Sequence, residues 1–202
     1  MHIFAGTAEQ FSRDPEDWIL VDSGFSGRQA SGRVTPSTGL RLPVWPVGRN
    51  VSWSEAKQLT STFLSSRTRP INVMLEAPLS VAFSDDGNPA PRAFEKSDNS
   101  SRYWYLQGGA VTLVSAAYMI GHWFKSNGPD LHLFEAFLSF KNQRQDHSDD
   151  ANDMLEAALT STPLSPAEMV QQPTDKLQSS TLELGLDFGV PPVFVISPRT
   201  SP

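Results

Sequence analysis

Residues 17–33 of the chain read DWILVDSGFSGRQASGR, and this stretch decides the fold. Residues 18–21 are an apolar run of the kind that forms a buried strand, and Asp22 interrupts that run. A carboxylate beside such a run is costly unless it is paired, hydrogen-bonded or bound to a metal. Glycines follow at positions 24, 27 and 32, which allows tight turns and a close approach to a ligand. Taken alone, VDSG also fits a strand that ends in an Asx-type turn.

The composition is that of an ordinary soluble domain. The chain has 202 residues, of which 39% are hydrophobic and 19% charged, enough for one domain with a full core. It has no cysteine, no apolar run near the roughly 18 residues of a membrane span, and no secretory signal at its start. We therefore expect a cytoplasmic protein without a membrane segment. The net charge of −6 argues against a general nucleic-acid coat, so any nucleic-acid contact should be short and local.

The remaining patterns predict an alternation of strands and helices. Strands are expected at 2–5, 17–25, 31–36, 39–47, 71–75, 130–137 and 193–196, and helices at 52–66, 103–124 and 146–159. The strands 17–25, 31–36 and 39–47 should form an antiparallel meander, with the third at an edge because it contains two prolines. Ser52-Trp53-Ser54-Glu55 is a capping box that should begin the first helix.

The longest predicted helix, 103–124, has several apolar residues at helical spacing, which should form one face packed on the sheet. These residues are Leu106, Ala110, Leu113, Val114, Ala117, Ile120 and Gly121. The helix is preceded by a long polar loop at 84–101. The tryptophans at positions 45, 53, 104 and 123 are expected to be core or helix-docking residues, and His122 and His132 to be structural.

Three predicted strands carry a carboxylate in or at the end of an apolar run, namely Asp22, Glu76 and Glu135. The helix predicted at 146–159 opens with DHSDD and adds further acidic groups. Hard divalent cations such as Mg²⁺ and Mn²⁺ prefer oxygen ligands, which proteins gather from several elements. The sequence therefore predicts a site for Mg or Mn where these elements meet.

The geometry of the late helix selects among its polar residues. Its apolar stripe consists of Ala151, Met154, Leu155, Ala158 and Leu159, and this stripe must face the sheet. His147 falls within the stripe and Asp150 on its border, while Asp149, Asp153 and Glu156 point away. Acidic residues in a first turn are also common as simple helix capping. The residues Asp150-Ala151-Asn152-Asp153 also fit a DxxD helix motif. Asp153 is therefore the alternative to Asp150 as the metal ligand on this helix.

The order of elements and several short motifs resemble the ribonuclease H-like superfamily. VDSGFS…SGR, LEAPLSV and HSDDANDMLEAA resemble motifs of the RuvC-type Holliday-junction resolvases. LFEAFLSF and the His-x-x-Asp-Ala helix motif are similar to those of the predicted nucleases related to them. The resemblance covers about residues 17–160 of a single domain spanning 1–202, with 161–202 as a C-terminal extension. It implies an α/β fold whose mixed five-stranded sheet has three antiparallel strands first and helices on both faces.

The resemblance also implies an activity, that of a metal-dependent phosphodiester hydrolase. In that reading Asp22, Glu76 and Asp150 are the catalytic metal ligands and hold two Mg or Mn ions. His147 or Glu135 would then be a fourth ligand, or would orient the ligands without binding the metal itself. The near-neutral pKa of an imidazole would also suit His147 as a proton carrier.

Arg92, Lys96 and Arg102 provide the local positive charge of the long loop and are the expected contacts to a substrate phosphate. Two alternatives to a nuclease stay open. The stretch DSGFSGR also resembles the phosphate-binding hairpin of the actin and sugar-kinase superfamily, although those phosphotransferases close a second lobe over ATP. The other alternative is a non-catalytic domain that uses the same fold for binding.

Overall fold

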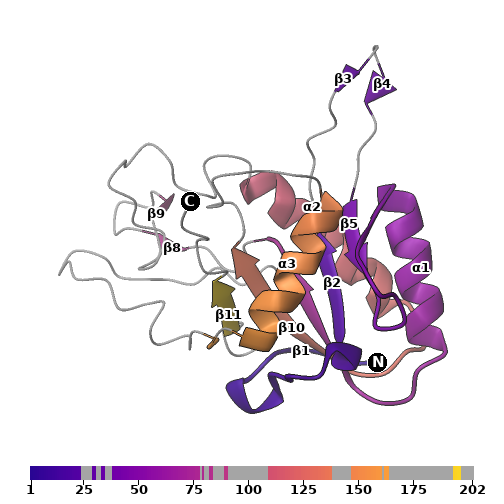
Figure 1. Ribbon diagram of the computed structural model, residues 1–202, viewed down its shortest axis with the longest axis vertical. Helices are drawn as coiled ribbons and strands as arrows, with labels where there is room; N and C mark the ends of the chain where they lie inside the picture. Colours follow the sequence, from indigo (N-terminus) through magenta and orange to yellow (C-terminus); the bar gives the residue numbers. More distant parts are fainter. Residues whose placement is uncertain are drawn as a thin grey trace.

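The structure is a computed structural model, and the residues it describes are 1–23, 29–30, 33–34, 38–77, 79, 82–83, 89–90, 109–137, 147–160, 162–163 and 193–196. It is an α/β fold in which three α-helices pack on one large mixed sheet (Figure 1). Within the described ranges, no helix is long and apolar enough to cross a membrane.

Five strands form the centre of the sheet, in the spatial order β6-β5-β2-β7-β10. Their bounds are Trp18–Asp22 for β2, Thr38–Arg41 for β5, Arg49–Val51 for β6, Ile71–Leu75 for β7 and Leu131–Phe137 for β10. Strand β5 is antiparallel to both of its neighbours, β2 and β6, whereas β7 runs parallel to both β2 and β10. The expected mixed α/β sheet is thus confirmed, although the parallel strand β1 (Ile3–Ala5) precedes the antiparallel strands in the chain.

The sheet continues beyond this centre. Along the other edge of β10, strand β1 (Ile3–Ala5) pairs in parallel with its first half and β11 (Val193–Ile196) with its second half. Two short antiparallel pairs stand apart from the sheet, β3 (Gln29–Ala30) with β4 (Arg33–Val34), and β8 (Ala82–Phe83) with β9 (Pro89–Ala90). Two 3₁₀ turns, η1 (Ala8–Gln10) and η2 (Pro15–Asp17), precede β2.

The prediction of strands at 31–36 and 39–47 was wrong in its bounds. Strand β4 pairs with β3 rather than with β2, and the partners of β2 and of its neighbour are β5 and β6. Pro43 and Pro46 lie between β5 and β6, where the Trp45 N–H donates to the Leu42 carbonyl at 2.9 Å and closes a turn. Because proline has no N–H to give to a ladder, the chain leaves the sheet here and re-enters it at Arg49.

Helix α1 (Trp53–Ser65) begins at the predicted capping box. The Ser52 hydroxyl accepts from the Glu55 N–H at 3.2 Å, and the Glu55 carboxylate accepts from the Ser52 N–H at 2.8 Å. Two orphan donors of the first turn are satisfied in this way.

Helix α2 (Gly109–Phe124) buries a face that only partly matches the predicted one, since Ile120 is buried as expected. Its buried apolar residues are Ala116, Met119, Ile120 and Trp123, whereas Val114 is 53% exposed. The helix is apolar on most of its circumference, so the spacing alone could not identify the packed face. Of the residues expected on that face, Leu106 lies outside the described residues, as do positions 103–108.

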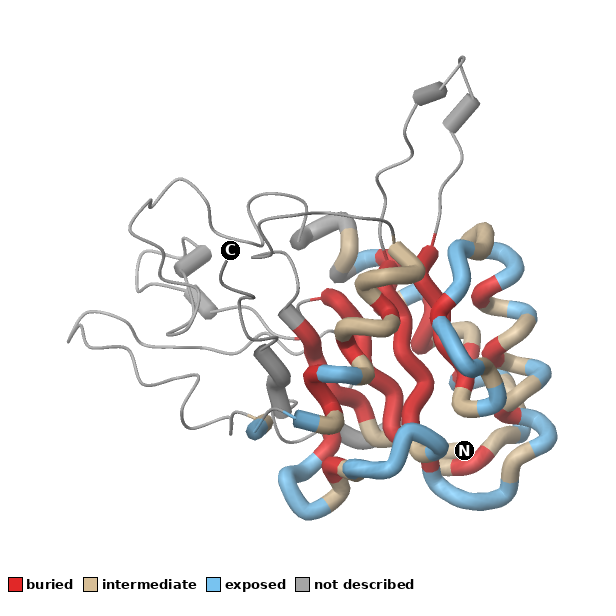
Figure 2. Tube along the Cα trace, viewed as in Figure 1, coloured by how far each residue is buried: buried red, intermediate tan, exposed pale blue. Residues whose placement is uncertain are grey.

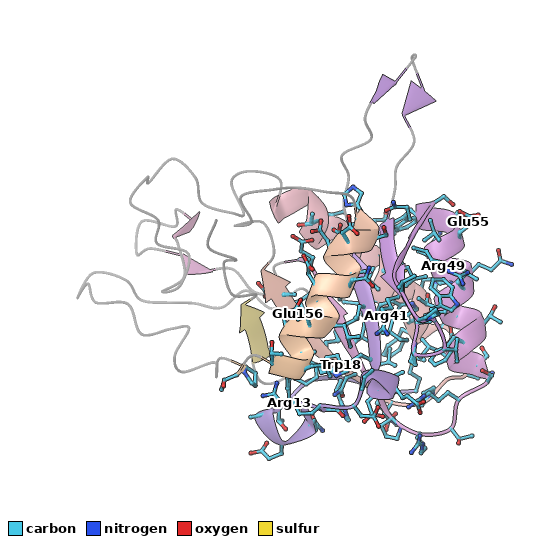
Figure 3. The ribbon with its side chains drawn as sticks, in the orientation of Figure 1. Arg13, Trp18, Arg41, Arg49, Glu55 and Glu156 are labelled. Carbon is cyan, nitrogen blue, oxygen red and sulfur yellow. The ribbon has the colours of Figure 1, made fainter. Side chains whose placement is uncertain are left out.

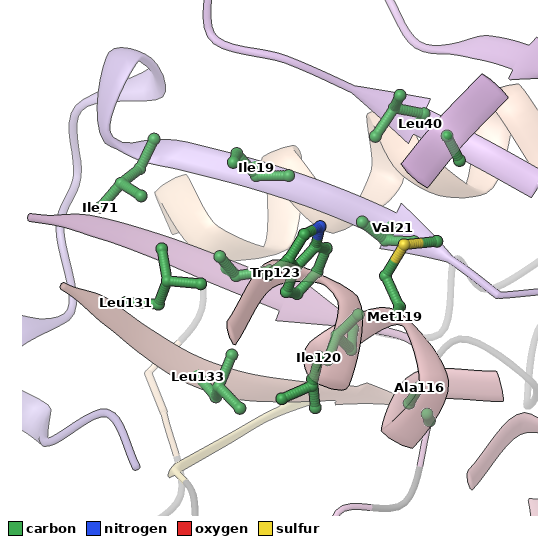
Figure 4. Close-up of a cluster of buried hydrophobic side chains, with 14 of the residues drawn as sticks. Ile19, Val21, Leu40, Ile71, Ala116, Met119, Ile120, Trp123, Leu131 and Leu133 are labelled. Carbon is green, nitrogen blue, oxygen red and sulfur yellow. The ribbon is translucent and has the colours of Figure 1, made fainter. Parts of the chain in front are cut away.

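The sheet is covered on both faces, as expected. Side chains of β2 alternate between the two cores, with Ile19 and Val21 facing α1 and α2, and Trp18 and Leu20 facing α3 (His147–Thr160). Figure 2 shows the strands as the most deeply buried layer, and Figure 4 shows Trp123 and its neighbours on α2 packed over one face while α3 lies behind the other. The expected helix 146–159 is α3.

Candidate functional site

Asp22 and Glu76 lie at the carboxyl ends of two neighbouring parallel strands, at the same edge of the sheet. Val21 of β2 is in register with Leu75 of β7, and the Glu76 N–H continues the ladder by donating to the Val21 carbonyl at 2.9 Å. Both carboxylates are buried, with 3% of Asp22 and 8% of Glu76 exposed. Parallel pairing therefore places these two acids where their strands end together.

The first turn of α3 adds two further side chains at this edge. Among the described residues, Asp22, His147 and Asp150 form a group whose potential ligand atoms all lie within 4.8 Å of one another. His147 Nδ1 is in hydrogen-bonding contact with Asp22 Oδ2, although the two residues are 125 positions apart in the chain. Asp22 is buried and the other two are half-buried, so the group lies at the border between core and surface. We call it the Asp22 group.

Two glycines allow α3 to approach the sheet closely enough to form this group. Gly39 lies opposite Asp22 in the register of β2 with β5, and a Cβ there would stand 1.8 Å from the His147 carbonyl oxygen. A Cβ on Gly48 would stand 2.5 Å from the Ser148 carbonyl oxygen, and the Gly48 N–H donates to Asn152 at 2.7 Å. Neither glycine was predicted from the sequence, although a glycine within a strand, such as Gly39 in β5, often marks a close backbone approach.

The orientation of α3 is the one that its apolar stripe predicts. Its buried residues are Ala151, Met154, Ala157 and Ala158, and the last three belong to one core with Trp18, Leu20 and Phe134 of the sheet. At the other end of the helix, Arg13 Nη1 donates to the Ala158 carbonyl at 2.7 Å (Figure 3). Both ends of α3 are thus attached to the sheet layer, which fixes the rotation that brings His147 and Asp150 to Asp22.

Glu76 and Glu135 are not members of the Asp22 group. Glu76 lies at the same sheet edge, and its carbonyl accepts from the Ser23 hydroxyl at 3.4 Å. Glu135 follows Leu133 by two residues, which places it on the face of the sheet that α1 and α2 cover, opposite to Asp22. It is fully buried there, and its Oε2 accepts from the Leu79 N–H at 2.8 Å. The structure therefore does not bring Glu135 together with Asp22.

The predicted phosphate contacts Arg92, Lys96 and Arg102 lie outside the described residues, as does Trp104. The two histidines expected to be structural are both described. His122 is half-buried near the end of α2. His132 lies in β10 between Asn72 and Gln10, and burial lowers the pKa of its imidazole. This arrangement supports a structural role for His132.

The Asp22 group has a donor set that suits a divalent cation. One imidazole nitrogen with two carboxylates is a combination that Mn²⁺ accepts readily, and the carboxylates also suit Mg²⁺. The burial of the Asp22 carboxylate is a further reason to expect a cation here. A bound cation would offset the free-energy cost of burying this charge, and would add to the contact that Asp22 makes with His147. His147 and Asp150 are partly exposed, which leaves the group open to solvent on the helix side.

Comparison of the chain with protein-family models, with curated proteins and with solved structures found no match. The function is therefore argued from the residues and their geometry.

Proposed function

We propose that this protein is a metal-dependent phosphodiester hydrolase, a nuclease of the ribonuclease H-like type, that binds Mg²⁺ or Mn²⁺ at the Asp22 group. The observation that carries the proposal is the convergence of Asp22, His147 and Asp150 from two elements far apart in the chain. Helix periodicity selects His147 and Asp150, and both reach the strand carboxylate. Glu76, at the end of the neighbouring strand, is the proposed ligand for a second ion.

The arrangement of the elements supports the assignment to this fold type. After β1, and leaving aside the short pairs β3–β4 and β8–β9, the chain forms β2, β5 and β6, each antiparallel to its neighbour in the sheet. Next come α1, β7, α2, β10 and then α3, which carries His147 and Asp150. The resemblance implies this order, with an acid on the first strand, on the fourth strand and near the start of the last helix.

The chemistry follows from the residues. Divalent ions held by Asp22, Asp150 and Glu76 would supply the means to activate a water molecule and to stabilise the leaving oxygen of a phosphodiester. In this proposal Asp22 is the buried ligand from β2, and Asp150 contributes a second carboxylate from the first turn of α3. His147 holds or transfers a proton beside them. A net charge of −6 favours a short, flexible or single-stranded substrate over a wrapped duplex. Arg92, Lys96 and Arg102 are its proposed phosphate contacts, and the cysteine-free composition suits a cytoplasmic location.

The test is cleavage of single-stranded, duplex and branched DNA and of RNA, with Mn²⁺ or Mg²⁺, by the wild type and by Asp22→Asn and Glu76→Gln. We expect wild-type cleavage that a chelator abolishes and that each variant reduces at least about a hundredfold, as for loss of a group essential in the transition state. Asp149→Asn is the matched control, because Asp149 shares the first turn of α3 without belonging to the Asp22 group. Its cleavage should equal that of the wild type.

Three results would contradict the proposal. Equal cleavage by wild type and both site variants would indicate a contaminating nuclease. Nucleic-acid binding without cleavage would favour the non-catalytic binding domain. Transfer of phosphate from ATP, with no cleavage, would favour the phosphotransferase.

A further inference from the structure

Glu135 is a fully buried carboxylate that lies apart from the Asp22 group. It sits in the second half of β10, in register with Leu75 of β7, and faces the core formed with α1 and α2. Burying a carboxylate is costly unless hydrogen bonds compensate for the lost water. One such bond comes from the backbone, since the Leu79 N–H donates to Glu135 Oε2 at 2.8 Å.

This bond holds the chain segment that begins with Glu76. At its start, the Glu76 N–H is bonded to the Val21 carbonyl of β2. Three positions further on, the Leu79 N–H is bonded to Glu135, and the Ala77 and Leu79 side chains are buried in the same core. The described residues Glu76, Ala77 and Leu79, which we call the Glu76 segment, are therefore attached to β2 at one end and to β10 at the other.

We propose that Glu135 is a positioning residue that fixes the Glu76 segment and thereby holds Glu76 at the sheet edge beside Asp22. The role of Glu76 in this inference rests on the proposed function. In this arrangement Glu135 acts as a hydrogen-bond acceptor, and its negative charge is not used to hold an ion. The alternative is that Glu135 contributes that charge to the metal site.

The two roles are separated by a pair of substitutions. Glu135→Gln keeps a carbonyl oxygen that can accept from Leu79 and removes the charge. Glu135→Met has a similar length and removes both the charge and the acceptor. Glu76→Gln is the matched control, since it changes the proposed ligand and leaves the bond between Leu79 and Glu135 in place.

The first measurement is amide hydrogen exchange at Leu79 in the full chain, which does not depend on any activity. We expect slow exchange in the wild type, in Glu135→Gln and in Glu76→Gln. In Glu135→Met the exchange at Leu79 should be about ten- to a hundredfold faster, as for loss of one buried hydrogen bond. If Leu79 exchanges in the folded wild type at the rate of an unfolded chain, the inference is wrong, and this result stands even if Glu135→Met does not fold.

The second measurement is Mn²⁺ affinity by titration of the same proteins. We expect Glu135→Gln to bind within about threefold of the wild type, and both Glu135→Met and Glu76→Gln to bind at least about tenfold more weakly. Weak Mn²⁺ binding by Glu135→Gln with a slowly exchanging Leu79 would overturn the inference, because the charge would then be what matters. If the wild type binds no Mn²⁺, the proposed function fails, and the exchange data alone decide whether Glu135 fixes the segment.

Discussion

The side chain of His132 is held in its neutral form by its neighbours. Gln10 Oε1 accepts from the Thr7 N–H at 3.0 Å, so its amide nitrogen faces His132 Nε2 at 3.1 Å. Asn72 donates its amide to the Gln10 carbonyl, so its Oδ1 faces His132 Nδ1 at 3.3 Å. These contacts assign the proton to Nδ1 and make Nε2 an acceptor. A second proton would put two donors face to face.

We therefore predict that stability depends on pH through His132. Burial lowers the pKa of His132 in the folded protein, while Asp130 opposes this to a smaller extent. The unfolded chain, with an imidazole pKa near about 6.5, then binds more protons than the folded one, so stability falls as the pH drops below that value. Urea unfolding between about pH 7 and 5 should show a shallower loss for His132→Gln than for the wild type. Parallel pH profiles for the two proteins would contradict this prediction.

A second prediction separates Asp150 from Asp153. Only Asp150 belongs to the Asp22 group, because it lies at the border of the face that α3 turns toward the sheet. Asp150→Asn should abolish the rise in melting temperature that Mn²⁺ causes, and Asp153→Asn should leave that rise intact. Differential scanning fluorimetry with and without Mn²⁺ measures both. If Asp153→Asn abolished the rise and Asp150→Asn left it intact, the ligand on α3 would be Asp153.

The contact between α3 and β5 gives a prediction about glycine. Gly39→Ala would place a Cβ 1.8 Å from the His147 carbonyl, so the first turn of α3 must move away from Asp22. We expect a loss of about 1–3 kcal/mol in the free energy of unfolding, typical of overpacking, together with loss of the Mn²⁺ response. Denaturant unfolding measures the first effect and Mn²⁺ titration the second.

Gly121→Ala is the matched control for Gly39→Ala. Gly121 lies inside α2, and an added Cβ there would meet nothing within 4 Å. Because alanine is the better helix former, this variant should gain up to about 1 kcal/mol and keep the Mn²⁺ response. A Gly39→Ala protein that is as stable as the wild type and still responds to Mn²⁺ would mean that α3 docks without needing this glycine.

The elements that the sequence predicted well are those with one unambiguous signal. The capping box fixed the start of α1, and the single apolar stripe of α3 correctly predicted that His147 and Asp150 face the sheet. Other elements were predicted correctly in type, but they lacked a signal for the direction of their side chains. Helix α2 is apolar nearly all round, and β10 is buried on both faces, so neither pattern says which way a given side chain points. For that reason the sequence could not separate Glu135 from Asp22.

At the scale of the whole molecule, the Asp22 group joins β2 to α3 and exists only in the folded chain. A cation bound there should stabilise the folded state alone, by about 2.7 kcal/mol when its free concentration is a hundred times the Kd. We predict that the melting temperature rises steadily with Mn²⁺ concentration and that a chelator reverses the rise. Asp22→Asn should remove this response and leave the metal-free protein at least as stable. If the variant is destabilised while the response persists, Asp22 is structural and the ion binds elsewhere.

Asp22 and His147 are separated by 125 positions in the sequence, and this separation has a consequence for synthesis on the ribosome. At about 5–20 residues per second, roughly 6–25 s pass between the addition of the two residues to the nascent chain. During that interval Trp18 and Leu20 have no α3 to cover them, so this side of the growing sheet is a natural place for a chaperone to bind. A hydrolase of the proposed kind would be inert throughout, and would become able to cut nucleic acid only after α3 has been translated and docked. If RNA is among its substrates, the messenger that encodes it would be protected from cleavage during its own translation.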